Sequence, residues 1–242
     1  MLLPLTQVQS LAPNGVYGRR PGDNAAVDSL PDLLLIERSR GGEQRAIEAL
    51  VRRYSRRLFR VARSVLVEED AAESAVQDAY LAAFADLSRY TPTGKFAAWL
   101  TRLTFTQARA PAAGTRPGQP ATPRQLAAEE PGAAEAREAL ERHELEKAIM
   151  ALPEVFRTVL VLRTVEGISG IETAASLGVH ETTVRTRMYR AQRRLGAELV
   201  QRLRLVAQGL FELAPERLDR IVKRVLAQLP HGSMLTMSAS PP

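Results

Sequence analysis

A helical repeat of apolar residues, kept for about six turns, is the feature that most restricts how this chain can fold. Between residues 44 and 66, apolar side chains recur every three or four positions, and arginines occupy the flanks. A stripe of this kind predicts a helix that buries one face. Related patterns cover residues 69–87, 95–109, 134–203 and 215–229, while β-branched runs bounded by turn residues are scarce. The sequence therefore predicts an all-α fold.

Proline and glycine residues divide the chain into segments. Residues 1–27 sustain no helical period, so we expect a disordered arm there. Residues 28–110 and 134–200 each hold enough periodic apolar residues for a small helical bundle. The intervening residues 111–133 contain five prolines and almost no large apolar side chain, which predicts a flexible linker. Residues 201–242 are expected to form a C-terminal helical extension followed by a disordered tail.

The composition excludes several kinds of site. The chain has no cysteine, and its three histidines lie far apart, so neither disulfides nor a paired set of metal ligands is expected. No apolar run approaches the ~18–20 residues of a membrane span, and the first residues lack the basic start of a secretory signal. We therefore expect no cofactor, no metal, no membrane insertion and a cytoplasmic location. The net charge of +6 fits a polyanionic partner.

Fragments of catalytic motifs occur, but none is complete. His143-Glu144 lacks the second histidine of a zinc-protease helix. Gly94-Lys95 is followed by Phe96, where a phosphate-binding loop would have serine or threonine. No set of serine, histidine and acid is suggested by position either. We therefore expect a protein without catalysis of its own.

The strongest local signal, within residues 167–195, predicts two helices joined by a tight turn. Ser169 and Glu172 have the spacing of a capping box, in which each side chain accepts a hydrogen bond from the other residue's backbone amide. The short helix that they begin ends at Gly178, a residue suited to a left-handed turn. Val179 is expected to pack between the two helices. The second helix is expected to bury one face, formed by Val184, Met188, Ala191 and Leu195.

The opposite face of the second helix is strongly basic. It carries Thr182, Thr183, Arg185, Thr186, Arg187, Arg190, Arg193 and Arg194. Arginines near the start of a helix in the major groove can meet guanine edges, while hydroxyls and more distal arginines meet phosphates. A solvated basic face on an ordinary helix is the alternative. The cap, the glycine turn and the helix lengths together favour docking on DNA.

These motifs resemble those of a known family. The residues concerned are Leu152-Pro153, Phe156-Arg157, Glu166-Gly167-Ile168-Ser169, Glu172-Thr173-Ala174, Leu177-Gly178-Val179, Thr183-Val184-Arg185-Thr186-Arg187 and Arg190-Ala191. From about residue 145 to residue 199 the chain resembles region 4 of the extracytoplasmic-function (group IV) sigma factors of RNA polymerase. The resemblance implies a module that reads the upstream (−35) promoter element through Thr182, Thr183, Arg185, Thr186, Arg187 and Arg190.

Residues 28–110 are similar to region 2 of the same family. The similarity is carried by Ala71-Ala72-Glu73, Val76-Gln77-Asp78, Phe84 and Trp99-Leu100. It implies that Gln77, Asp78 and Ala82 dock on the coiled coil of the polymerase β′ subunit. It also implies that an unstacked base of the downstream (−10) element is received by Arg89, Tyr90, Lys95 and Phe96. Trp99 is expected in the core.

The implied partners follow from this resemblance. They are core RNA polymerase, through its β′ and β subunits, and promoter DNA, with an anti-sigma factor as a further candidate. A stand-alone helix-turn-helix regulator is the main alternative. It explains residues 150–200 equally well, but it leaves the resemblance of residues 28–110 to region 2 unexplained.

The C-terminal extension resembles one found in a proteobacterial-type subset of the family. Its motif reads Asp219-Arg220-Ile221-Val222…Val225-Leu226. The sequence leaves open whether this helix packs on region 4 or binds something else. The end of region 2 departs from the family pattern, since Thr106 stands at the usual asparagine, Arg109 is all that is left of a basic run, and Pro111 follows. These departures affect promoter melting more than polymerase docking.

Overall fold

The computed structural model describes residues 27–91, 95–110 and 133–229, and every regular element in these ranges is helical. The first bundle contains α2 (Asp32–Arg40), α3 (Gln44–Arg63), α4 (Glu69–Ala85), the 3-10 turn η1 (Leu87–Arg89) and α5 (Phe96–Arg109). The second contains α6 (Ala133–Met150), α7 (Glu154–Leu160), the π-helix η2 (Val161–Val165), α8 (Gly170–Leu177), α9 (Glu181–Leu195), α10 (Ala197–Val206) and η3 (Ala207–Gly209). The expected arm, apart from Val27, nearly all of the expected linker and the tail after Leu229 lie outside the described residues.

Each bundle has its own apolar core, as the helical periods predict. In the first, the fully buried side chains include Leu35, Leu50, Leu58, Val76, Tyr80 and Leu100. In the second, they include Leu145, Ile149, Leu160, Val161, Leu203 and Leu210. The buried hydroxyl of Tyr80 donates to the Val51 carbonyl at 3.0 Å, so this polar atom keeps a partner inside the first core.

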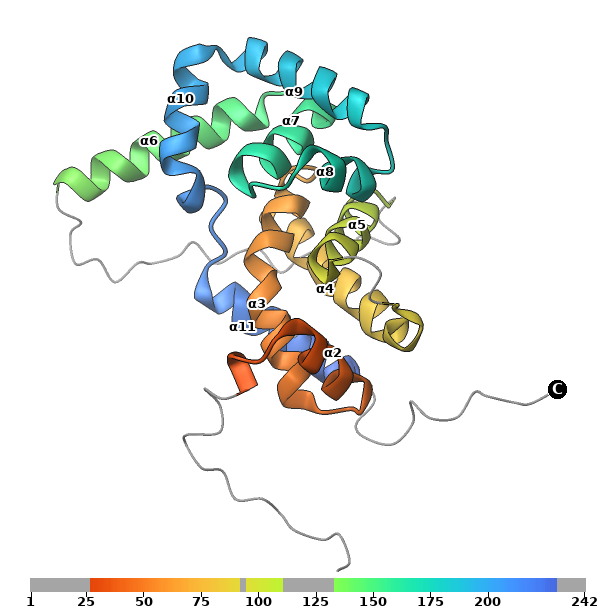
Figure 1. Ribbon diagram of the computed structural model, residues 1–242. Helices are drawn as coiled ribbons and strands as arrows, with labels where there is room; N and C mark the ends of the chain where they lie inside the picture. Colours follow the sequence, from red (N-terminus) through yellow and green to blue (C-terminus); the bar gives the residue numbers. More distant parts are fainter. Residues whose placement is uncertain (1–26, 92–94, 111–132, 230–242) are drawn as a thin grey trace, which may run out of the picture.

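The two bundles lie directly against each other (Figure 1), with α5 beside α8 and the end of α3 beside η2. A small apolar cluster of Val61, Leu162 and Ile168 lies in this contact. The Glu166 carboxylate, on a side chain that is 6% exposed, accepts from Arg57 at 3.0 Å and from Arg60 at 2.9 Å. The sequence predicts two units that a linker joins, whereas the structure adds a packed, ion-paired contact between them.

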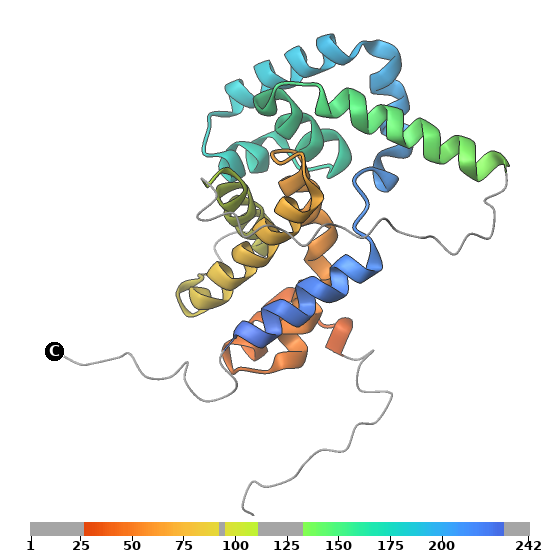
Figure 2. The same cartoon turned by 180° about the vertical axis from the view of Figure 1, so that it is seen from behind.

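The last helix, α11 (Pro215–Gln228), returns to the first bundle, as Figure 2 shows from behind. Proline at its first turn suits a helix start, because that position needs no backbone donor. Ile221, Val222 and Val225 are buried in the core that α3 and α4 form. The C-terminal helix is therefore an element of the first bundle, although about a hundred residues separate it from that bundle in the sequence.

Candidate nucleic-acid interface

The capping box begins the helix-turn-helix as its spacing predicts. The Ser169 hydroxyl accepts from the Glu172 amide at 3.2 Å, and the Glu172 carboxylate accepts from the Ser169 amide at 3.3 Å. Gly178 ends α8 in the left-handed conformation, with φ 64°. The chain then enters α9, whose Val184, Ala191 and Leu195 are buried, while Met188 is half-buried. The local sequence therefore suffices to place α9 as the exposed second helix of the motif.

The outer face of α9 presents a basic and hydroxyl-rich surface. Thr182, Arg185, Thr186 and Arg190 are exposed, and Thr183 and Arg187 are half-exposed. A shallow groove of about 370 Å³ lies along this face, and Val155 and Phe156 of α7 form its other wall. Among the described residues, Arg187 and Arg190 have no hydrogen-bond or ion-pair partner. Both guanidinium groups are therefore available to donate hydrogen bonds to a ligand.

Other arginines of the same helix are engaged within the protein. Arg185 lies 3.8 Å from the Glu181 carboxylate, one turn back. The Arg193 guanidinium lies over the Tyr189 ring, 5.9 Å from its centroid, and that of Arg194 lies 5.1 Å from the Phe156 centroid. The sequence groups Arg193 and Arg194 with the DNA-facing residues, whereas the structure gives both of them aromatic partners. Among the arginines of α9, this leaves Arg187 and Arg190, which both line the groove, without a partner in the described part of the protein.

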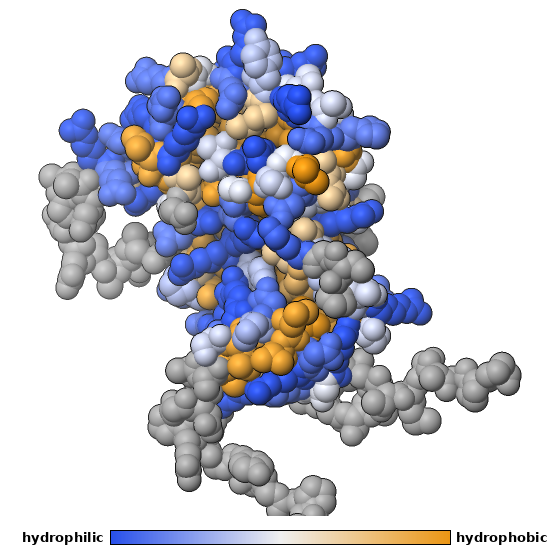
Figure 3. Space-filling model, viewed as in Figure 1, coloured by the Kyte–Doolittle hydropathy of each residue, from blue (hydrophilic) through white to orange (hydrophobic). Residues whose placement is uncertain are grey.

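A second hollow, of about 390 Å³, lies in the first bundle. Its lining consists of Asp32, Leu33, Ile36, Tyr54, Tyr90, Lys95, Phe96 and Ala97. The predicted residues Tyr90, Lys95 and Phe96 are therefore brought together, whereas Arg89 does not line the hollow. Beside it, α2 exposes Leu33 and Leu34 (59 % and 49 % exposed), where Figure 3 shows an apolar patch low on the molecule.

Aromatic rings form one wall of this hollow. Tyr90 lies 4.8 Å from Trp99 and 5.4 Å from Phe96, measured between ring centroids, and Tyr54 lies 5.7 Å from Phe96. Phe96 itself is buried, and Trp99 is partly buried against the core, as expected. Tyr90 is therefore the most accessible aromatic ring of the lining, and Lys95 and Leu33 add exposed side chains.

Asp32 and Tyr54 are members of this hollow that the sequence did not indicate. The Tyr54 hydroxyl donates to the Asp32 carboxylate, and Arg53 pairs with the same carboxylate at 2.6 Å. Burial, and then the Asp32 carboxylate, raise the pKa of Tyr54, so the phenol stays protonated and keeps donating. Asp32 lies in the first turn of α2, where an acidic residue is usual for any helix, so its position gave no signal of a site.

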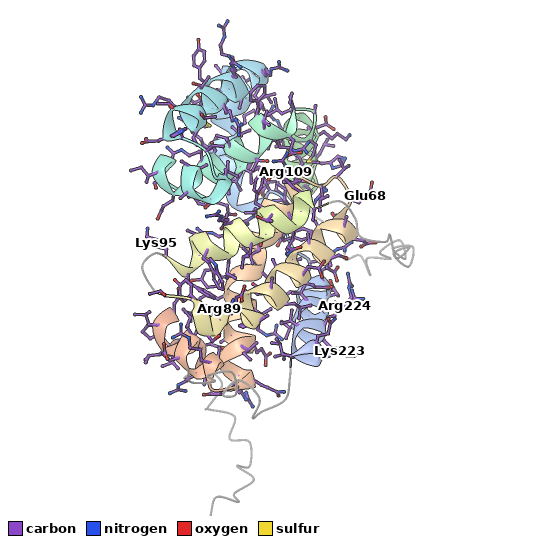
Figure 4. The ribbon with its side chains drawn as sticks, turned by 90° about the vertical axis from the view of Figure 1, so that its right-hand side faces the viewer. Glu68, Arg89, Lys95, Arg109, Lys223 and Arg224 are labelled. Carbon is purple, nitrogen blue, oxygen red and sulfur yellow. The ribbon has the colours of Figure 1, made fainter. Side chains whose placement is uncertain are left out.

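Lys95 connects the hollow to the second bundle. Its ammonium lies 2.7 Å from the Glu172 carboxylate, the same group that caps α8. The hydrogen bond from Lys95, and then that from Ser169, lower the pKa of Glu172. Two predicted sites, the −10 loop and the helix-turn-helix, therefore touch in this structure. Figure 4 shows Lys95 and Arg89 on one side of the first bundle, opposite Lys223 and Arg224 of α11.

The two residues at which the end of the first bundle departs from the family pattern, Thr106 and Arg109, both have partners within the protein. The Thr106 hydroxyl donates to the Arg102 carbonyl of its own helix at 2.9 Å. Arg109 pairs with Glu154 of α7 at 3.2 Å and lies over the Phe105 ring. The remaining basic residue of the expected basic run is therefore engaged by the second bundle.

The three predicted polymerase-docking residues lie on α4 and differ in exposure. Gln77 is only 3 % exposed, and the guanidinium of Arg224 on α11 donates to its side-chain oxygen at 2.9 Å. Asp78 is exposed, and partial burial raises the pKa of its carboxyl. Ala82 is half-exposed. The structure thus leaves two of the three residues accessible and covers the third with the C-terminal helix.

Residues 27–91, 95–110 and 133–229, which the structure describes, also bear on metal and membrane sites. Within those residues, no three His, Asp or Glu side chains are grouped so that they could hold a metal ion. No helix there is both long and apolar enough to cross a membrane.

Comparison with known proteins assigns both bundles. The family model for sigma-70 region 2 matches residues 50–107, and the model for sigma-70 region 4 matches residues 142–195. The ECF RNA polymerase sigma factor SigM of Mycobacterium tuberculosis is 32% identical over 159 residues, which cover 64% of this chain and 77% of SigM. RNA polymerase sigma factor CnrH of Cupriavidus metallidurans is 31% identical over 189 residues, which cover 69% of this chain and 94% of CnrH.

A solved structure agrees with these matches. The structure of CnrH in complex with the cytosolic domain of CnrY superposes with a TM-score of 0.52 at 30% sequence identity, and covers 69% of this chain and 96% of that one. A stand-alone helix-turn-helix regulator would account for the region 4 match alone. The chain belongs to the extracytoplasmic-function sigma factors, and it acts in transcription initiation by directing core RNA polymerase to promoters.

Proposed function

We propose that the outer face of α9 reads the −35 promoter element from the major groove. The observation that carries this proposal is the groove beside α9, where Arg187 and Arg190 have no partner among the described residues. A helix of this kind places its exposed side chains against base edges and phosphates. In this proposal Arg187 supplies a base contact, and Arg190 and the threonine hydroxyls hold the DNA backbone.

The test measures binding of holoenzyme to a promoter that is first selected from a genomic library by transcription in vitro. Arg187→Ala is expected to weaken binding about tenfold and to relax specificity at one position of the −35 element. Arg204→Ala is the control, because Arg204 is also an arginine with an accessible side chain but lies on α10, outside the groove. An unchanged promoter profile in Arg187→Ala would refute the proposed readout.

The hollow beside Tyr90 is proposed to receive an unstacked base of the −10 element. Aromatic faces bind single-stranded bases by stacking, and a nearby cation holds the backbone. Tyr90 supplies an accessible ring, and Lys95 supplies the cation once it leaves Glu172. Tyr90→Ala is expected to reduce permanganate reactivity of the −10 strand about tenfold, since one stacked base contributes roughly 1–3 kcal/mol. Equal reactivity in this variant and in wild type would remove the hollow from the mechanism.

The first bundle acts as region 2, and its α4 face around Gln77, Asp78 and Ala82 docks on the β′ coiled coil. The second bundle acts as region 4 and lies near the β subunit. We place the protein in the cytoplasm, where polymerase and promoter DNA meet, and assign it no catalysis of its own. An anti-sigma factor is a further proposed partner, supported by the complex of CnrH with the cytosolic domain of CnrY.

A further inference from the structure

The C-terminal helix α11 packs on the first bundle through two parallel stripes. One stripe is apolar, and its Ile221, Val222 and Val225 are buried among residues of α3 and α4. The other stripe is basic and consists of Arg217, Arg220 and Arg224, which are spaced three and four residues apart. Residues at this spacing share one helix face, so the three guanidinium groups form a row.

The basic row meets an acidic row on α4. Arg217 lies 3.0 Å from Glu69, 2.7 Å from Asp70 and 2.9 Å from Glu73. Arg220 donates to both oxygens of Glu73, at 3.1 and 2.7 Å. Glu73 is the best-shielded acid of the row, with a side chain that is 9% exposed, and the side chain of Arg217, which pairs with it as well, is only 14% exposed.

The row ends on the proposed polymerase-docking face. Residues 69, 73 and 77 of α4 are four apart, and Arg224 covers Gln77 as the last member. Gln77 in turn donates to Glu73 at 3.3 Å, so its amide has partners on both sides. A second helix cannot reach Gln77 while α11 occupies this edge, because the side chain is already buried.

The segment directly before α11 can serve as a hinge about which the helix moves. Leu210 and Phe211 are buried in the second core, whereas Leu213 is buried in the first. Phe211 has φ 50°, a left-handed conformation that is uncommon for a residue other than glycine. About half of the side-chain surface of Glu69, Asp70 and Arg220 is exposed to solvent, so separating these ion pairs costs less than separating pairs that are buried on both sides.

We propose that α11 is an autoinhibitory helix, which occupies the Gln77 edge of α4 in the free protein and must leave before core polymerase docks. This inference rests on the proposed docking face of α4. The apparent affinity for polymerase is then the intrinsic affinity reduced by the fraction of molecules in which α11 is displaced. A helix tethered to its own binding site competes at high effective concentration.

A reversible crosslink tests the proposal without altering the docking face. Arg52 of α3 and Asp219 of α11 form an ion pair of 3.0 Å at the surface, and the chain has no cysteine. Arg52→Cys/Asp219→Cys in the full-length chain, joined by a reducible bis-methanethiosulfonate, holds α11 in place. The crosslinked protein is expected to bind core polymerase at least tenfold more weakly than the same protein after reduction. Equal affinity before and after reduction would overturn the inference.

A second variant weakens the contact instead of fixing it. Arg217→Glu/Arg220→Glu places like charges opposite Glu69, Asp70 and Glu73 and is expected to raise polymerase affinity severalfold. Arg204→Glu/Lys223→Glu is the matched control, since both side chains are exposed and the change in charge is the same. Similar affinities in the two double variants would count against autoinhibition.

The two experiments separate this inference from the function on which it rests. If every form, crosslinked or not, binds polymerase with the affinity of wild type, autoinhibition is wrong, while binding of this chain to core polymerase stands. If no form binds polymerase, including the reduced protein and the charge-reversal variant, the proposed docking itself fails, and the inference with it.

Discussion

Replacing Arg157 with alanine is expected to destabilise the protein strongly, because this side chain donates hydrogen bonds across the contact between the two bundles. Arg157 lies on α7 of the second bundle and is only 6% exposed. Its guanidinium donates to the carbonyls of Ser64 at 2.6 Å and Val65 at 3.0 Å, directly after the end of α3. It also donates to the Met150 carbonyl at 2.8 Å. Burial lowers its pKa, yet an arginine stays charged.

The magnitude follows from these three short hydrogen bonds. Each contributes about 1 kcal/mol net, and carbonyls left buried without a donor add to the loss. The free energy of unfolding should therefore fall by about 3 kcal/mol in Arg157→Ala. Arg157→Lys should lose roughly half as much, because one ammonium cannot span the acceptors that a planar guanidinium reaches.

Urea unfolding followed by circular dichroism measures this loss. With a slope of about 2 kcal/mol per molar urea, the midpoint of Arg157→Ala should fall by roughly 1.5 M. Arg137→Ala is the control, since Arg137 is a highly exposed residue of α6, and its midpoint should stay within the range of ordinary surface substitutions. A shift below about 0.5 M in Arg157→Ala would refute the reasoning, because it would mean that water replaces the guanidinium at little cost.

Two further predictions concern the capping box. Ser169→Ala removes the oxygen that accepts from the Glu172 amide and should lower the unfolding free energy by about 1 kcal/mol, measurable by thermal melting; no change would show that the cap is dispensable. The pKa of Glu172 is lowered by Lys95 and Ser169, so its stabilising effect is present above the pKa of the unfolded chain and is lost as pH falls through the lower folded value. The difference in melting temperature between wild type and Glu172→Gln should shrink below about pH 4, and a constant difference would contradict this assignment.

The helix-turn-helix was predictable because its determinants are local. Ser169 and Glu172 are three residues apart, and the left-handed turn needs only Gly178 at the end of a short helix. The face of α9 follows from its period, and the groove beside it contains the predicted Thr182, Thr183, Thr186, Arg187 and Arg190. The aromatic hollow was predicted only in part. Tyr90 and Phe96 lie close in sequence, whereas Asp32 and Tyr54 come from helices that sequence spacing does not bring together.

The sequence by itself determined the helices, their buried faces and the two modules that the family models match. A helical period predicts that one face of the helix is buried. Because the hydrophobic effect is non-directional, the period does not predict which other element covers that face. Tertiary structure alone decided that Glu166 pairs with α3, that Lys95 meets Glu172, and that α11 lies on α4. These contacts depend on how side chains distant in sequence complement one another in shape and charge. Through them, the two predicted modules pack directly against each other.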